Sequence, residues 1–124
     1  MLNVTFVQIN ETEVPRLRAW LDTLSSRTAE LAESYRLQHT RQELFYLIEG
    51  REHPTLVIVS ESADLQAGAK EFLSSELSID VEFKTLIQDI SIADPAVELV
   101  YDSTLLLPVP ASRSVIEEDA GQGG

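Results

Sequence analysis

The stretch "LVIVSESADLQAGAKEFLSSELSIDVEFKTLIQDI", residues 56–90, decides the fold, because an apolar β-branched run leads there into two segments with helical periodicity. The first segment begins at Ser62 or Asp64, either of which can cap a helix. Its apolar residues recur at helical spacing and should share one face: Leu65, Ala69, Phe72 and Leu73. In the second segment the same spacing joins Ile79, Phe83, Leu86, Ile87 and Ile90. We predict two short helices, or one bent helix broken near Ser78, packed on a sheet.

The residues before this stretch supply one strand and one long helix. Residues 2–9, "LNVTFVQI", are rich in β-branched residues and predict a strand. Asn10 or Thr12 can cap the helix that follows, and Pro15 is tolerated in a first turn, where its missing N–H would have no partner. Apolar residues then recur every three or four positions from Val14 to Tyr35, so we expect a single helix that ends near residues 37–40.

A hairpin joins this helix to the deciding stretch. Residues 42–50 and 55–61 predict two strands, connected by the turn "GREHP". Both strands are apolar on both faces, whereas a sheet with one wet face alternates apolar with polar residues. Each face of the sheet therefore needs a cover, and the helices can supply only one.

The last strand is expected at residues 96–107, "AVELVYDSTLLL", after a loop "SIADP". We therefore predict one domain over residues 1–107 and a flexible tail over residues 108–124, which is polar and ends in glycine. The order β-α-β-β-α-β is the ferredoxin-like, split βαβ arrangement. It predicts an α+β fold, a four-stranded antiparallel sheet with helices on one face. Two such sheets packed through their open faces would form a dimeric α/β barrel, so we expect a homodimer.

Composition limits the chemistry. The chain has 124 residues, a formal net charge of −12 and no cysteine, which excludes disulfides and thiolate chemistry. The negative field opposes binding to nucleic acid and to anionic lipid. The N-terminus has no basic, apolar signal pattern and no run is long enough to span a membrane, so we expect a cytoplasmic protein. The charge also leaves open an acidic protein that regulates or binds other proteins.

Two short motifs resemble a bacterial family of domains of unknown function within the dimeric α/β-barrel superfamily. One is the Arg18-x-Trp20 step in "VPRLRAWLDTL", and the other is Ile79-Asp80-x-Glu82-x-Lys84 in "ELSIDVEFKTLI". The resemblance covers residues 2–102. Relatives often carry histidine before this lysine, where the present chain has Phe83. The superfamily includes cofactor-independent monooxygenases, haem-degrading enzymes and proteins without known activity, so the resemblance implies a fold rather than a function.

Candidate site residues are few. Neither His39, at the end of the long helix, nor His53, in the hairpin turn, has the neighbours of a metal site, and no catalytic or phosphate-binding motif is present. We therefore predict no cofactor and no metal. Asp80 and Glu82 are expected in the first turn of their helix, where the dipole favours acids, beside a solvated Lys84. The candidate ligand-binding residues are Trp20, Tyr35, His39 and Tyr46.

Three hypotheses for function remain. The first is a small homodimeric domain that binds an apolar ligand or a protein. The second is a cofactor-independent monooxygenase-like enzyme, whose proton acceptor would be His39 or a carboxylate with a pKa raised by burial. The third is the acidic interaction protein. A large dry pocket with one buried ionisable group would favour the enzyme, and a filled core with a continuous acidic face would favour the interaction protein. The most useful observation is whether each protomer has a pocket above ~300 Å³ with convergent polar groups.

Overall fold

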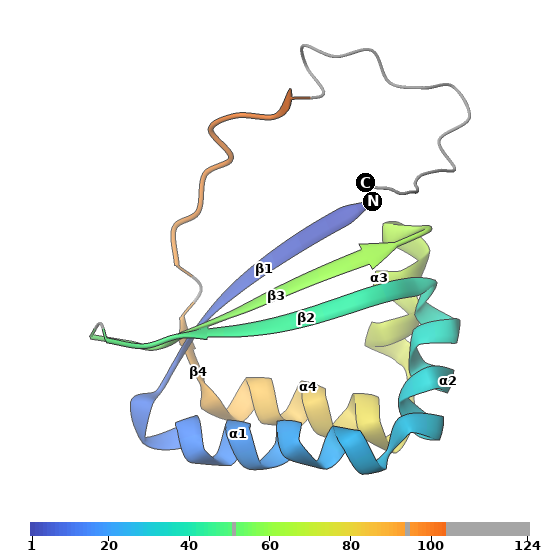
Figure 1. Ribbon diagram of the computed structural model, residues 1–124, viewed down its shortest axis with the longest axis horizontal. Coiled ribbons are helices and arrows are strands. Elements are labelled where there is room, and N and C mark those ends of the chain that lie inside the picture. The colour runs from blue at the N-terminus through green and yellow to red at the C-terminus, as the bar shows by residue number, and fades with distance from the viewer. Residues whose placement is uncertain (51, 94, 104–124) are drawn as a thin grey trace.

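The computed structural model describes residues 1–50, 52–93 and 95–103. Four strands, β1 (Leu2–Ile9), β2 (Thr40–Ile48), β3 (Thr55–Ser62) and β4 (Ser91–Ala93), form one antiparallel sheet in the order β2-β3-β1-β4. Four α-helices, α1 (Val14–Asp22), α2 (Thr28–Gln38), α3 (Leu65–Ser74) and α4 (Ser78–Ile90), lie on one side of this sheet (Figure 1). The expected α+β class, with a four-stranded antiparallel sheet and helices on one face, is confirmed.

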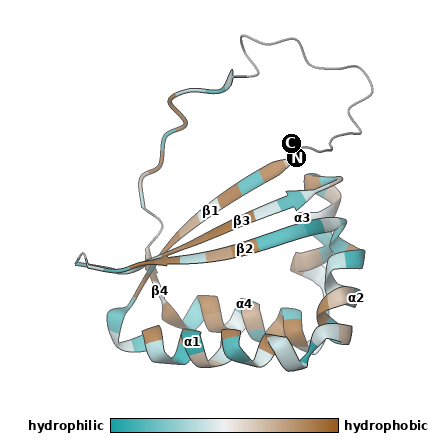
Figure 2. Cartoon of the chain, viewed as in Figure 1, coloured by the Kyte–Doolittle hydropathy of each residue, from teal (hydrophilic) through white to brown (hydrophobic). Residues whose placement is uncertain are grey.

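The strand register separates two faces of the sheet. On the face toward the helices, which we call the inner face, Ile58 lies between Phe45 of β2 and Thr5 of β1. One residue along each strand, Val57 lies between Tyr46 and Phe6 on the outer face. The outer face carries a patch of apolar side chains: Leu2, Val4, Phe6, Leu44, Tyr46, Ile48, Val57 and Val59. Several of these are exposed, Leu2, Tyr46 and Ile48 by half or more of their surface. Figure 2 shows the hydrophobic colour along these strands.

The packed core occupies one end of the space between sheet and helices. Helices α1 and α4 pack against β1 and β3 through a cluster of buried side chains: Val7, Ile9, Leu56, Val14, Leu17, Leu86 and Ile90. At the other end the inner face carries Asn3, Thr5, Glu43 and Ser60, which are too small or too polar to fill the space beneath α2 and α3. We call these two regions the packed end and the open end.

The single long helix predicted from Val14 to residues 37–40 is wrong. The chain forms α1, a 3-10 turn at Thr23–Ser26 and then α2, and the break falls at Arg27, with φ −123° and ψ 40°. The hydroxyls of Thr23 and Ser26 bond to backbone carbonyls three residues earlier, at 2.6 and 2.9 Å. Such bonds give the backbone an alternative to the helix. Figure 1 shows α2 turned steeply away from α1 as a result.

The last strand predicted at residues 96–107 is also wrong over the residues that the structure describes. The N–H of Asn10 donates to the carbonyl of Ile90 (2.9 Å), so the end of α4 meets the end of β1. The residues directly after α4, Ser91–Ala93, therefore pair with Gln8 and Ile9 as β4. Residues 95–103 form no strand, and Leu99 and Val100 are about four-fifths exposed. Residues 104–107 and the predicted tail, 108–124, lie outside the described residues.

The deciding stretch is confirmed as β3 followed by two separate helices. Asp64 caps α3, since its carboxylate accepts from the N–H of Ala67 (3.1 Å), while Ser62 is buried. Of the expected apolar face of α3, Leu65, Ala69 and Phe72 face the sheet side, but Leu73 is exposed. Gly68 lies against the backbone of α2, where a Cβ would stand 2.3 Å from the carbonyl oxygen of Gln38. The two helices that roof the open end are therefore in close contact.

Candidate functional site

The open end contains a cavity of about 710 Å³ between the inner face of the sheet and helices α2, α3 and α4. This volume lies within the range of about 300–1,000 Å³ that is typical of small-molecule sites. Apolar side chains from every surrounding layer form most of its wall, among them Leu24, Leu31, Ile58, Leu65 and Ile87. The deciding stretch supplies one wall from β3 and the roof from α3 and α4.

Aromatic rings gather around Phe83 of α4. Its ring centroid lies 5.4 Å from that of Trp20, 5.7 Å from that of Phe45 and 6.3 Å from that of Phe72. All four side chains line the cavity. Phe83 is only partly buried, because part of its ring borders the cavity and not other protein atoms. The helical face that the sequence predicted as packing is therefore divided: Leu86 and Ile90 are core, whereas Phe83 and Ile87 line a cavity.

A network of ionic groups fixes Trp20 in this wall. The indole N–H donates to Glu82 Oε1 (2.9 Å), and the same carboxylate accepts two bonds from Arg27 (2.6 and 3.1 Å). These bonds, above all those from Arg27, lower the pKa of Glu82. Arg27 also pairs with Glu30 (2.8 Å), which in turn accepts from the Ser78 hydroxyl (2.6 Å) and the Ile79 N–H (2.8 Å) at the start of α4. The network therefore joins the ends of α1, α2 and α4 beside the cavity.

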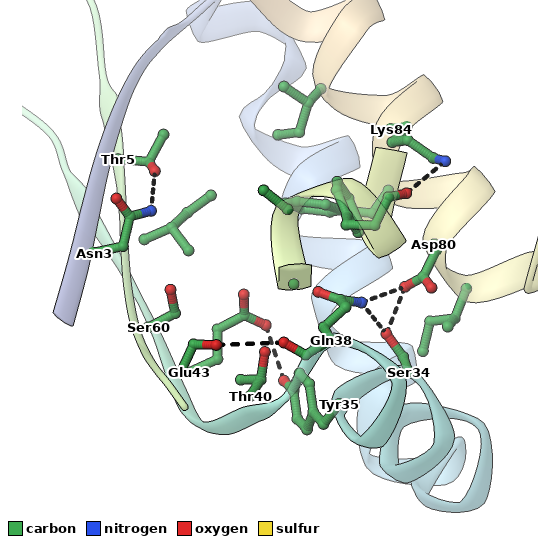
Figure 3. A pocket seen from close by; sticks show the side chains of 18 of the residues that line it. Asn3, Thr5, Ser34, Tyr35, Gln38, Thr40, Glu43, Ser60, Asp80 and Lys84 are labelled. Carbon is green, nitrogen blue, oxygen red and sulfur yellow. Dashed lines mark hydrogen bonds between the residues drawn. The ribbon is translucent and has the colours of Figure 1, made fainter. Parts of the chain in front are cut away.

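The polar wall is built around Glu43 and Tyr35. Alternation along β2 puts Glu43 on the inner face with Phe45, and α2 brings Tyr35 to it, so that the Tyr35 hydroxyl donates to Glu43 Oε1 (2.9 Å; Figure 3). Burial raises the pKa of the Glu43 carboxyl, and the charge of Asp80 raises it further. Burial and the charge of Glu43 also raise the pKa of the Tyr35 hydroxyl. The pair is half-buried, and the other ionisable residues that line the cavity are Asp80 and Lys84.

Asp80 forms a second polar group deeper in the fold. It is buried, and its carboxylate accepts from the hydroxyls of Ser34 and Ser75 (2.6 Å each) and from the Gln38 amide (3.4 Å). Asp80 lies in the first turn of α4, as expected, but it is buried, and Glu30 from α2 accepts from the Ile79 N–H at the start of that helix. Asp80 instead ties α2 to the α3–α4 connection.

Lys84 is not a solvated lysine. Its ammonium donates to the carbonyl oxygens of Phe72 (2.8 Å), Leu73 (3.1 Å) and Ser75 (3.0 Å) at the end of α3, where the Phe72 carbonyl also accepts from the Ser75 N–H (3.2 Å). Its charge is thus held at the end of α3, away from Glu43 and Tyr35 (Figure 3).

The structure brings together two of the four ligand-binding residues proposed from sequence. Trp20 and Tyr35 line the cavity. His39 ends α2 in the left-handed conformation (φ 59°) and is exposed, and Tyr46 lies on the outer face. His53, in the hairpin turn, is exposed as expected. Sequence reasoning missed Glu43, although "QELFYLIEG" held a signal: the acid is in phase with Phe45 and Leu47, the inner residues of that strand.

The described residues contain neither a cluster of metal ligands nor a membrane-spanning helix. Within residues 1–50, 52–93 and 95–103, no three His, Asp or Glu side chains converge as metal ligands would. None of the helices in that part of the chain has the length and apolar character needed to cross a bilayer.

No family model, no curated protein and no solved structure matches this chain.

Proposed function

We propose that the protein binds a small organic molecule in the cavity of the open end. The observation that carries this proposal is the combination of about 710 Å³ of space, an aromatic wall and one polar pair, Tyr35 and Glu43. An apolar pocket with a few convergent polar groups is the usual form of a ligand site. The body of the ligand would contact the rings around Phe83, and one polar group would reach Glu43.

Fluorescence of Trp20 tests this proposal, because it is the only tryptophan of the chain and lines the cavity. Titration with an uncharged aromatic compound such as phenylbutanol should change the emission and saturate. Ala69→Phe places a ring in the cavity wall on α3 and should weaken binding. Ala29→Phe makes the same change on an exposed position of α2 outside the cavity and should not. Equal affinities of the two variants would contradict the cavity as the binding site.

We also propose that the fold is ferredoxin-like and that two copies associate through their outer faces, as the resemblance implies. The position of β3 between β1 and β2 supports the first part. The apolar patch of the outer face supports the second. A chain of net charge −12 repels its own copies, and this face is suited to overcome the repulsion since its one acid, Glu61, is paired with the N-terminal ammonium.

Light scattering tests the dimer. The wild-type protein should show twice the monomer mass of 13.8 kDa. Leu44→Glu adds a charge to the outer face and should give a monomer, whereas Leu73→Glu adds one to an exposed position of α3 and should not. A wild-type monomer at micromolar concentration would refute the dimer.

One observation favours the enzyme as a second candidate. Glu43 is a carboxyl with a raised pKa in a cavity wall, which is the environment of a general base. It would accept a proton from a bound phenol or quinol, and a ring carbon of the resulting anion would add O2. The peroxide would take the proton back from Glu43 and lose water, which leaves a quinone with one oxygen atom from O2. Oxygen consumption with hydroquinones should then be lost in Glu43→Gln, and wild-type protein without such consumption would exclude this candidate. The third hypothesis, the acidic interaction protein, would be favoured by a filled core together with a continuous acidic face, and the cavity does not meet the first of these conditions.

A further inference from the structure

The charged side chains that line the cavity determine which polar group of a ligand fits there. Glu43 and Asp80 both line the cavity, from β2 and α4 respectively. The lining residues of α3 carry no charge, and the ammonium of Lys84 is bound by three carbonyl oxygens at the end of that helix. Among the described residues, therefore, no cation of the protein neutralises Glu43. The polar wall has an excess of negative charge.

Glu43 also has bonding capacity left. Tyr35 donates to Oε1, and Oε2 accepts no hydrogen bond from the described part of the chain. A half-buried carboxylate oxygen without a donor is unfavourable, and a ligand that brings a donor removes this cost. A donor that is also cationic removes the charge imbalance as well, and its hydrogen bond to a carboxylate is roughly twice as strong as one between neutral groups.

We infer that the ligand is an organic amine, which binds as an ammonium ion with its charged group on Glu43 Oε2 and its hydrocarbon body against Trp20, Phe45 and Phe83. This inference rests on the proposed binding function and specifies its ligand class. Aromatic rings attract cations as well as apolar groups, so the body of the site suits the same ligand. The net charge of −12 adds a long-range attraction for cations.

A set of three ligands with one common body tests the inference. Phenylbutylamine, phenylbutanol and phenylbutanoate differ only in the terminal group, which is cationic, neutral or anionic at pH 7. We expect the wild-type protein to bind the amine about tenfold more tightly than the alcohol, as one charge-assisted hydrogen bond allows. The carboxylate should bind most weakly. Calorimetry gives the three dissociation constants, and Trp20 emission confirms that each ligand enters the cavity.

Glu43→Gln keeps the shape of the site and removes its charge. It should bring amine affinity down to about that of the alcohol, so that the tenfold preference for the amine disappears. Glu71→Gln removes an exposed acid of α3 that does not line the cavity, so it should preserve the tenfold preference and thereby exclude a general effect of net charge.

The pH dependence of wild-type binding gives a second measurement that needs no variant. Tyr35 from α2 and Asp80 from α4 face Glu43, and Tyr35 keeps its proton throughout the acidic range because its pKa is raised. Protonation of Glu43 should abolish the preference for the amine over the alcohol.

The possible outcomes separate the inference from the proposed function. Binding of the alcohol with no preference for the amine, or a preference that survives in Glu43→Gln, overturns the inference and leaves the ligand site intact. Tightest binding of phenylbutanoate also overturns it, since Glu43 would then act as a protonated donor. A failure of all three ligands to change Trp20 emission overturns the proposed function itself.

Discussion

Phe83→Ala tests whether the deciding stretch serves packing or a site. A fully buried phenylalanine loses about 3–5 kcal/mol on truncation to alanine. Phe83 borders the cavity on one side, so the mutation enlarges an existing space and does not open a new one. About half of a transfer term of ~2–3 kcal/mol is then lost. Contacts with the rings of Trp20, Phe45 and Phe72 add about 0.5–1 kcal/mol. We expect a loss near 2 kcal/mol.

Leu86→Ala is the matched control on the same helix. Leu86 is only 4% exposed and belongs to the packed core, so its truncation should cost about 3 kcal/mol or more. The smaller side chain should therefore be the more costly one to remove, which reverses the order expected from size alone. Urea unfolding of the two variants measures both losses.

The two variants should have the opposite order in ligand affinity, which Phe83→Ala should reduce more than Leu86→Ala. Phe83→Ala should weaken phenylbutanol binding about three- to tenfold, because one ring of the aromatic wall is lost. Leu86→Ala should leave that affinity unchanged. A loss above about 3 kcal/mol for Phe83→Ala, with ligand affinity preserved, would show that Phe83 is an ordinary core residue and would refute this division of α4.

Three further substitutions test the polar groups. The pKa of the Glu43 carboxyl in the folded protein lies above its ordinary value of 4.5, so ionisation of this group lowers the free energy of unfolding as pH rises through the folded-state pKa. Glu43→Gln should therefore unfold at a higher temperature than wild type at pH 7 and at the same temperature below pH 4.5. Asp80→Ala leaves the hydroxyls of buried Ser34 and half-buried Ser75 without their acceptor and should cost about 3 kcal/mol, against less than about 1 kcal/mol for Asp89→Ala on the exposed side of α4. Lys84→Met should cost about 1–2 kcal/mol and Lys70→Met, at an exposed position, almost nothing; equal urea midpoints would show that the three carbonyl bonds of Lys84 add no stability.

Periodicity predicted the elements, whereas local hydrogen bonds decided where they end. The strand at residues 2–9, the hairpin and the pair of helices at Leu65–Ser74 and Ser78–Ile90 follow from apolar spacing alone. The break at Arg27 does not, because the apolar stripe continues across it and only the hydroxyl-rich "TLSSRT" marks it. The β-rich run at residues 96–103 forms no strand since Ser91–Ala93 already occupy the end of β1. A single sequence shows which segments favour a β-strand, but not which of two such segments pairs with β1.

The candidate site was predictable only in part, because a cavity is a property of what fails to fill space. Aromatic residues at helical spacing give the same sequence pattern whether their side chains pack against other side chains or border a cavity. The sequence therefore predicted a packing role for Phe83. The acids gave a better signal. Asp80, Phe83 and Ile87 share helical spacing, and Glu43 shares strand phase with Phe45, so both acids fall on faces that should be apolar.

Both acids break the pattern at the same place, the open end, and this coincidence argues for a site. An unfilled volume and a half-buried carboxyl with a raised pKa each lower stability, and either could be removed by an apolar substitution. The packed end of the same chain has neither, so the fold itself does not require them. At the open end, moreover, Gly68 sets the close contact of α2 and α3, and Asp80 ties α2 to the α3–α4 connection, so the roof is held above the cavity and does not collapse into it. An unfilled volume and buried acids that occur together, under helices that are held in place, are typical of functional sites.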